Sequence, residues 1–239
     1  MNDMVNGETK IAVIAAHPDD EILGCGATLK KWAGEGAQIK VLILGEGITS
    51  RRKIRNREAD KAHIEQLKRS CLHANRTLGV DEVILKEFPD NRFDSVDLLD
   101  IIKEIESFLQ KFPATIIMTH HRGDLNIDHQ ITNRAVMTAS RPGQVWAPDI
   151  ILCFDILSST ELYFGSRENY FIPHVFIDVT RTIDDKIKAM SYYESEIKPF
   201  PYARSLDSVR IQAQRYGQMV NLEAAEAFEC VRAVIHGSR

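Results

Sequence analysis

The stretch that decides the fold runs from an apolar segment into one histidine and three acids. It reads Ile11-Ala12-Val13-Ile14-Ala15-Ala16-His17-Pro18-Asp19-Asp20-Glu21. The apolar residues are small or branched, which is typical of a strand buried on both faces of a parallel sheet. Because a proline disfavours the helical conformation in the residue before it, the strand is predicted to continue to His17. Pro18 is suited to the first position of a helix, with the three acids in its first turn. Open α/β sheets bind ligands at the carboxyl ends of their strands, so this stretch is a candidate metal site.

A purely structural explanation of the same stretch also exists. Proline followed by acids is an ordinary way to begin a helix, since the free N–H groups and the dipole of the first turn stabilise carboxylates. This explanation covers residues 18–21 but gives no reason for His17 at the end of the strand.

Length and composition limit the class of protein. We expect one domain over residues 1–239, with a flexible end at residues 1–9. The chain is 44% hydrophobic and 27% charged, and its net charge of −4 argues against a nucleic-acid partner held by bulk electrostatics. The four cysteines are widely separated, no signal-peptide core is present, and no apolar stretch approaches the roughly 20 residues that span a bilayer. We therefore expect a cytoplasmic enzyme that does not contact membranes, and the sequence leaves a homo-oligomer open.

A second group of polar residues follows another predicted strand. Residues 115–119 form a buried strand that ends in His120 and His121, and a polar loop then leads through Asp128-His129 into a helix predicted over residues 130–140. Strand and helix patterns alternate elsewhere as well, with strands predicted at 39–44, 83–85, 150–154, 175–179 and 228–235 and helices at 22–32, 56–78, 98–112, 182–193 and 205–216. This order predicts an α/β fold with a mostly parallel sheet and helices on both faces. Both polar groups should then meet at one edge of the sheet.

The residue types in these two groups suit a catalytic zinc ion. His17, His129 and one of the two aspartates after His17 would supply two imidazoles and a carboxylate, leaving one position for water. Zinc lowers the pKa of bound water to about 7, which produces a nucleophile at neutral pH. The other aspartate would act as general base, and Asp128 would orient a ligand from behind. The predicted reaction is an attack of water on a carbonyl or phosphoryl centre.

At this point the residues resemble a known family. His17-Pro18-Asp19-Asp20-Glu21 and the loop from Thr119-His120-His121 to Asp128-His129 are similar to the signature of the PIG-L/LmbE-like zinc-dependent N-deacetylases. The similarity extends to Phe88-Pro89-Asp90, Arg141-Pro142, Gly217 and Ala225-Glu226-Ala227-Phe228. The resemblance implies a Rossmann-like (LmbE-like) fold and removal of the acetyl group from an N-acetylated amino sugar. It also implies the roles of four residues, with Zn²⁺ bound by His17, Asp20 and His129 and with Asp19 as the general base.

One position departs from the family pattern. Many members carry a histidine three positions before the last zinc ligand, where it stabilises the oxyanion and serves as acid, whereas this chain has Asn126. An amide can donate a hydrogen bond but cannot deliver a proton. We therefore expect Asn126 to donate to the oxyanion. The acid role stays open among His120, His121, Asp124 and Asp19.

The predicted substrate is a small, soluble N-acetyl sugar, either free, nucleotide-linked or joined to a sugar acid. Candidate partners for sugar hydroxyls are the loop residues Asp90, Asn91 and Arg204. Arg51 and Arg52 belong to a cationic run over residues 51–57, which either begins a solvated helix or binds a phosphate or carboxylate of the substrate. Aromatic residues that could stack on a ring are Trp146, Tyr163 and Tyr202.

Two alternative functions use the same residues. A magnesium- or manganese-dependent phosphoesterase would use the acids, but Asp128-His129 is followed by Gln130 rather than a second histidine, and two histidine ligands favour zinc. A non-catalytic member of the family would bind the metal and a sugar without cleavage, and Asn126 keeps this alternative open. A nucleotide-cofactor enzyme is excluded because the first strand is not followed by a glycine-rich turn.

Overall fold

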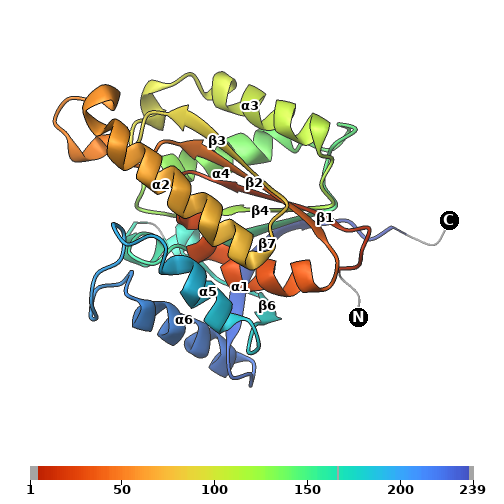
Figure 1. The fold of residues 1–239 in the computed structure, drawn as a ribbon. Coiled ribbons are helices and arrows are strands. Elements are labelled where there is room, and N and C mark those ends of the chain that lie inside the picture. Colours follow the sequence, from red (N-terminus) through yellow and green to blue (C-terminus); the bar gives the residue numbers. More distant parts are fainter. Residues whose placement is uncertain (1–4, 166, 237–239) are drawn as a thin grey trace.

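The computed structural model describes residues 5–165 and 167–236, and its centre is one twisted sheet (Figure 1). The strands of this part of the chain are β1 (Lys10–Ala15), β2 (Gln38–Gly45), β3 (Glu82–Phe88), β4 (Ile116–His120), β5 (Ile150–Phe154), β6 (Val175–Asp178) and β7 (Ala225–Ala233). They form a seven-stranded sheet in the order β3-β2-β1-β4-β5-β7-β6. The first five run parallel, and β7 runs antiparallel to both of its neighbours. Because β1 and β4 are adjacent, the loops after them share the carboxyl edge where the strand order reverses.

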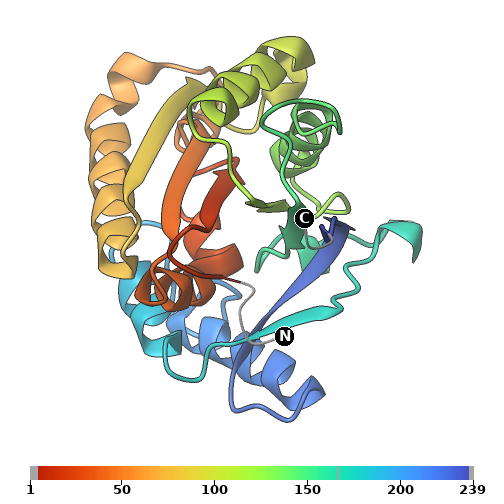
Figure 2. The same cartoon turned by 90° about the vertical axis from the view of Figure 1, so that its right-hand side faces the viewer.

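Helices cover both faces of this sheet (Figure 2). They are α1 (Asp20–Gly34), α2 (Arg57–Leu78), α3 (Leu98–Lys111), α4 (Ile127–Ala139), α5 (Ile183–Met190) and α6 (Leu206–Met219). Alternate residues of β1 belong to two different cores: Ile11 and Val13 pack with α1, α2, α5 and α6, and Ala12 and Ile14 pack with α3 and α4. This two-sided burial explains why β1 contains no polar residue after Lys10. The predicted α/β fold is confirmed.

Among the helix boundaries that differ from the sequence prediction, two concern the site. Helix α1 begins at Asp20 rather than Pro18, because Asp19 adopts a left-handed backbone conformation with φ 115°. Helix α4 begins at Ile127, earlier than residue 130, because the Asn126 side chain accepts a hydrogen bond from the backbone N–H of Asp128 and caps the helix. As a result Asp128 lies in the first turn of a helix and not in a loop.

The amino-terminal residues that the structure describes form a turn beside the sheet. Val5 is buried in the core, and the backbone N–H of Thr9 donates to the carbonyl of Asn6. Val5 and Thr9 are buried and residues 6–8 are exposed, whereas residues 1–4 lie outside the described residues. The flexibility of residues 1–9 stays a prediction. Within the described ranges we find no helix whose length and apolar character would let it cross a bilayer.

Candidate metal centre

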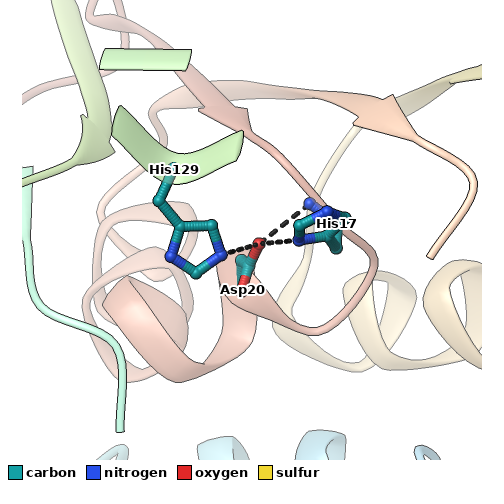
Figure 3. A group of neighbouring side chains, drawn as sticks. All are labelled: His17, Asp20 and His129. Atoms are coloured by element: carbon teal, nitrogen blue, oxygen red, sulfur yellow. Dashed lines mark hydrogen bonds and ion pairs between the residues drawn. The ribbon is translucent and has the colours of Figure 1, made fainter. Parts of the chain in front are cut away.

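Three side chains from the two predicted polar groups meet at the carboxyl edge of the sheet (Figure 3). His17 follows β1, Asp20 is the first residue of α1, and His129 lies in the first turn of α4. Asp20 Oδ2 lies 3.4 Å from His17 Nδ1 and 3.3 Å from His129 Nε2. One potential ligand atom from each residue falls within 4.8 Å of the others. The predicted meeting of the ends of the first and fourth strands is therefore correct.

The unpaired atoms of this group fit a divalent cation. Asp20 Oδ1 and His129 Nε2 are buried and have no hydrogen-bond partner among the described residues. A buried polar atom without a partner costs about 1–3 kcal/mol, so these two atoms need an explanation. Two imidazoles and a carboxylate form the ligand set of catalytic zinc sites, in which a further position stays open. A bound metal ion would satisfy these atoms.

Each of the two histidines has a carboxylate behind it. Asp128 Oδ2 lies 2.9 Å from His17 Nε2, and Asp124 Oδ2 lies 3.1 Å from His129 Nδ1. Such carboxylates fix the tautomer and the orientation of a ligating imidazole. Asp128 is held in turn by the backbone N–H groups of Asn91 and Phe93. Asp128 thus contacts His17, and its predicted role of orienting a metal ligand would act on that residue.

The role of Asp124 is missed by the sequence prediction, which considers it only as an acid. Its carboxylate accepts hydrogen bonds from the hydroxyls of Ser159 and Thr160 as well as facing His129. Burial alone would raise the pKa of Asp124, but His129 and the two hydroxyls lower it to about 2. Asp124 is therefore an ionised support for His129 and does not hold a proton at neutral pH.

The pKa shifts at this edge show that Asp20 and His129 stabilise each other's charged forms. Burial opposes the charge on Asp20, yet His129 and His120 hold the pKa of this carboxyl well below its usual range. Burial likewise opposes protonation of His129, but Asp20 and Asp124 raise the pKa of His129 to about 9. A metal cation would take the place of these protons, because ligands bind metals in their deprotonated form.

The carboxylates behind the histidines give a direct prediction. We expect Asp124→Asn and Asp128→Asn each to weaken zinc affinity about 10–100-fold, because each removes the charge that orients a ligand. Affinity is measured by competition with a chromogenic chelator. Asp100→Asn changes an exposed aspartate on α3 and is the matched control. Unchanged affinity in both variants would show that these carboxylates do not support a metal.

Beside the candidate metal ligands, Asp19 faces a polar pocket of about 190 Å³. Its left-handed backbone conformation costs a residue other than glycine about 1–3 kcal/mol, so it must be held by its surroundings. Asp19 Oδ2 accepts a hydrogen bond of 2.8 Å from Arg204 Nη1. Burial raises the pKa of Asp19 well above its usual range, although Arg204 opposes this shift.

The sequence of this chain is similar to those of known proteins. The model of a family described as PIG-L, GlcNAc-PI de-N-acetylase, matches residues 12–140, which include every residue of the metal centre. The chain belongs to the PIG-L family. A diacetylchitobiose deacetylase of Thermococcus kodakarensis is 25% identical over 98% of this chain and 87% of its own length. A probable N-acetyl-α-D-glucosaminyl L-malate deacetylase 2 of Bacillus cereus is 24% identical over 79% of this chain and 84% of its own length.

Solved structures share the PIG-L fold of this chain. The N,N'-diacetylchitobiose deacetylase of Pyrococcus horikoshii has a TM-score of 0.74 at 16% identity and covers 93% of this chain and 84% of its own. A zinc-inhibited form of teicoplanin deacetylase has a TM-score of 0.73 at 17% identity and covers 94% of this chain and 99% of its own. A 4-carboxy-2-hydroxymuconate hydratase of Pseudomonas putida also matches, with a TM-score of 0.68, 15% identity and coverage of 97% and 99%. Proteins with this fold therefore catalyse more than one reaction, so the reaction of this chain has to be inferred from the residues of its site.

Within this PIG-L site, several residues predicted to bind substrate do line the pocket. They are Arg51, Asp90, Asn91 and Arg204, together with Asn126. Arg51 forms an ion pair of 2.5 Å with Glu196, a pocket residue that the sequence does not signal. Asn126 Nδ2 donates to Asn91 Oδ1, so the two amides form one wall. Arg204 contacts Asp19 and Ser158, which makes it a partner of the predicted base and not only a candidate for sugar hydroxyls.

Other predicted residues point away from the pocket. Arg52 binds the carboxylate of Asp60 near the start of α2, so its proposed contact with substrate is not supported. His121 Nδ1 lies 2.7 Å from a carboxylate oxygen of Glu229, and His121 Nε2 lies 3.0 Å from the backbone carbonyl of Asn169. His121 is thus held on the side of β7, outside the lining of the polar pocket. The aromatic residues Trp146, Tyr163 and Tyr202 are absent from the pocket lining.

Proposed function

We propose that this chain is a zinc-dependent N-deacetylase that hydrolyses the acetamido group of an N-acetylated amino sugar. The observation that carries the proposal is the meeting of His17, Asp20 and His129 beside the carboxylate of Asp19. The two curated relatives, which are named as deacetylases of N-acetyl sugars, support the reaction class. The expected products are acetate and a free amine.

The chain supplies both the metal ligands and the proton acceptor of this reaction. His17, Asp20 and His129 would hold zinc, which polarises a carbonyl and lowers the pKa of water to about 7 when bound. Asp19 takes the proton of the attacking water as general base. Arg204 binds Asp19 Oδ2, which fixes the carboxylate and leaves the other oxygen to accept the proton.

The same aspartate is the best candidate to protonate the leaving amine. His120 Nε2 already accepts a hydrogen bond from the backbone N–H of Ala16, and His121 faces Glu229. Asp124 is occupied by His129 and two hydroxyls. Of the four candidates only Asp19 both lines the pocket and receives a proton in the preceding step. As the C–N bond breaks, Asp19 would return that proton to the departing nitrogen.

The residues that line the pocket are suited to stabilising the oxyanion and to binding the sugar. An amide nitrogen carries two hydrogens, and the bond to Asn91 uses one of those on Asn126, so in this proposal the other donates to the oxyanion. Apart from Pro18 and Gly47 the lining side chains are polar, which favours a hydroxylated ring over a lipid chain or a stacked base. Asp90 and Asn91 are positioned to bind sugar hydroxyls. Arg51 would exchange Glu196 for an anionic group of the substrate, such as a phosphate or a carboxylate.

A screen of substrates tests this function. Purified protein is incubated with free, nucleotide-linked and acid-linked N-acetyl sugars, and acetate and amine are both quantified. We expect equal amounts of acetate and amine from at least one substrate, loss of this activity with a chelator, and its return with added zinc. Release of phosphate from phosphoesters without acetate would identify a phosphoesterase instead. Zinc and sugar binding without any turnover would identify a non-catalytic member of the family.

A further inference from the structure

Glu21 is fully buried next to the metal centre and has no part in the chemistry described so far. Its two carboxylate oxygens contact different parts of the chain. Oε2 accepts a hydrogen bond of 3.0 Å from the backbone N–H of Asp19. Oε1 accepts bonds of 2.6 Å from the Tyr193 hydroxyl and 2.8 Å from the Asn75 amide. Glu21 thus links the start of α1 to α2 and to the segment after α5.

The contact with Asp19 lies where the backbone is strained. Asp19 has a φ of 115° and precedes the first residue of α1, but its side chain makes no capping hydrogen bond. Its carboxylate turns instead toward Arg204. Its N–H would otherwise be a buried donor, and Glu21 provides the acceptor. Without that acceptor the backbone could relax toward an ordinary conformation, which would redirect the carboxylate.

We propose that Glu21, held by Tyr193 and Asn75, is the positioning residue that keeps the Asp19 carboxylate aimed at the reacting water. The inference rests on the proposed function, because Asp19 matters as a base only if the chain is a hydrolase. The competing explanation is structural: Glu21 would only tie α1 to its neighbours. If Glu21 positions Asp19, disrupting it lowers kcat by more than an equal loss of stability elsewhere does. If Glu21 is only structural, the same loss of stability leaves kcat unchanged.

The chain offers a matched pair of tyrosines for this comparison. Tyr193 donates to Glu21, and Tyr216 donates a bond of 2.5 Å to Asp155, which is not part of the metal centre or the polar pocket. Tyr193→Phe and Tyr216→Phe each remove one hydroxyl that donates to a carboxylate. We expect Tyr193→Phe to lower kcat about tenfold, with KM and zinc affinity unchanged, and Tyr216→Phe to leave kcat unchanged. Both variants are assayed well below their measured Tm.

A second variant acts on the carboxylate itself. In Glu21→Gln an amide NH₂ replaces one of the two carboxylate oxygens, so it faces either the Asp19 N–H or the Asn75 amide. Because an NH₂ group does not accept hydrogen bonds, at least one of these donors loses its acceptor. Since a displacement of about 1 Å can cost 10²-fold in rate, we expect a fall in kcat of up to about 10²-fold with zinc affinity retained. Equal kcat in Tyr193→Phe, Tyr216→Phe and the parent chain would overturn the proposal, as would a loss of zinc affinity that matches the loss of kcat.

A readout that needs no substrate separates this inference from the proposed function. The crystal structure of the Glu21→Gln variant should show Asp19 moved away from its φ of 115° and its bond to Arg204 lost. If the parent chain releases no acetate from any N-acetyl sugar, the proposed function fails and this structure still decides the positioning. An unchanged Asp19 conformation in the variant would overturn the inference even in an active deacetylase.

Discussion

Replacing Asp19 with asparagine is expected to lower kcat by about 10²–10⁴-fold, the range that a positioned general base contributes. The substitution keeps the shape of the side chain and can keep an oxygen toward Arg204, whose bond to Asp19 is 2.8 Å long. It removes the group that accepts the proton of the attacking water. Because the proposed ligand set, His17, Asp20 and His129, does not include Asp19, we expect zinc to remain bound at one ion per chain. The rate is measured as acetate release at saturating substrate, and zinc by atomic absorption.

A second pocket carboxylate provides the control for this experiment. Asp90 lines the same pocket and accepts a hydrogen bond from the backbone N–H of Ser50, but it is proposed to bind substrate rather than to move a proton. Asp90→Asn should therefore raise KM more than it lowers kcat. Normal acetate release by Asp19→Asn would rule out the base assignment, and loss of zinc from that variant would make Asp19 a ligand.

The meeting of His17 and His129 could be predicted from the sequence because its signals are local. A run of apolar residues ends in His17, a second run ends shortly before the helix that carries His129, and parallel strands present their carboxyl ends at one edge. Neither the positions of the two strand ends nor their shared edge depends on a contact between side chains. The adjacency of β1 and β4 then brings the two loops together. The α/β fold follows from the same alternation of strand and helix patterns.

The supports of the site could not be predicted, because each depends on a contact between distant segments. Tyr193 reaches Glu21 across 172 positions, and Arg204 reaches Asp19 across 185. Neither residue lies in a motif, and a loop arginine or a buried tyrosine has many ordinary explanations. The contact of His121 could not be predicted for a similar reason. His121 directly follows β4, but its partner Glu229 lies on β7, whose antiparallel pairing with β5 has no local signal.

Glu226 belongs to the segment Ala225-Glu226-Ala227-Phe228, which resembles the family, but the sequence alone gives no physical reason for a glutamate at this position. Its contacts in the structure give that reason. Glu226 accepts hydrogen bonds of 3.1 Å and 2.6 Å from the backbone N–H groups of Ala27 and Thr28, inside α1. The buried Lys186 donates 2.7 Å to the carbonyl of Leu23 and 2.6 Å to Glu226. Two side chains from β7 and α5 therefore bind backbone groups that a regular helix would pair with one another. This ion pair is part of the hydrogen bonding of α1.

We accordingly expect Lys186→Met to reduce the free energy of unfolding by about 3–5 kcal/mol, because it leaves the Glu226 carboxylate buried without its countercharge. The loss is measured by denaturant unfolding at neutral pH. Lys31→Met is the matched control, since Lys31 also belongs to an ion pair on α1, with Glu35, but both side chains are more than one-third exposed. The control should cost less than about 1 kcal/mol.

A cost for Lys186→Met no larger than that of the control would mean that Glu226 finds another partner or becomes protonated when Lys186 is removed. If the expected difference is found, it also bears on the site, because α1 carries Asp20 and Glu21 in its first turn. A helix whose hydrogen bonds are completed by β7 and α5 cannot shift without breaking them. The acidic segment at its start is therefore anchored by α5, which packs on the same face of the sheet as α1, and by β7.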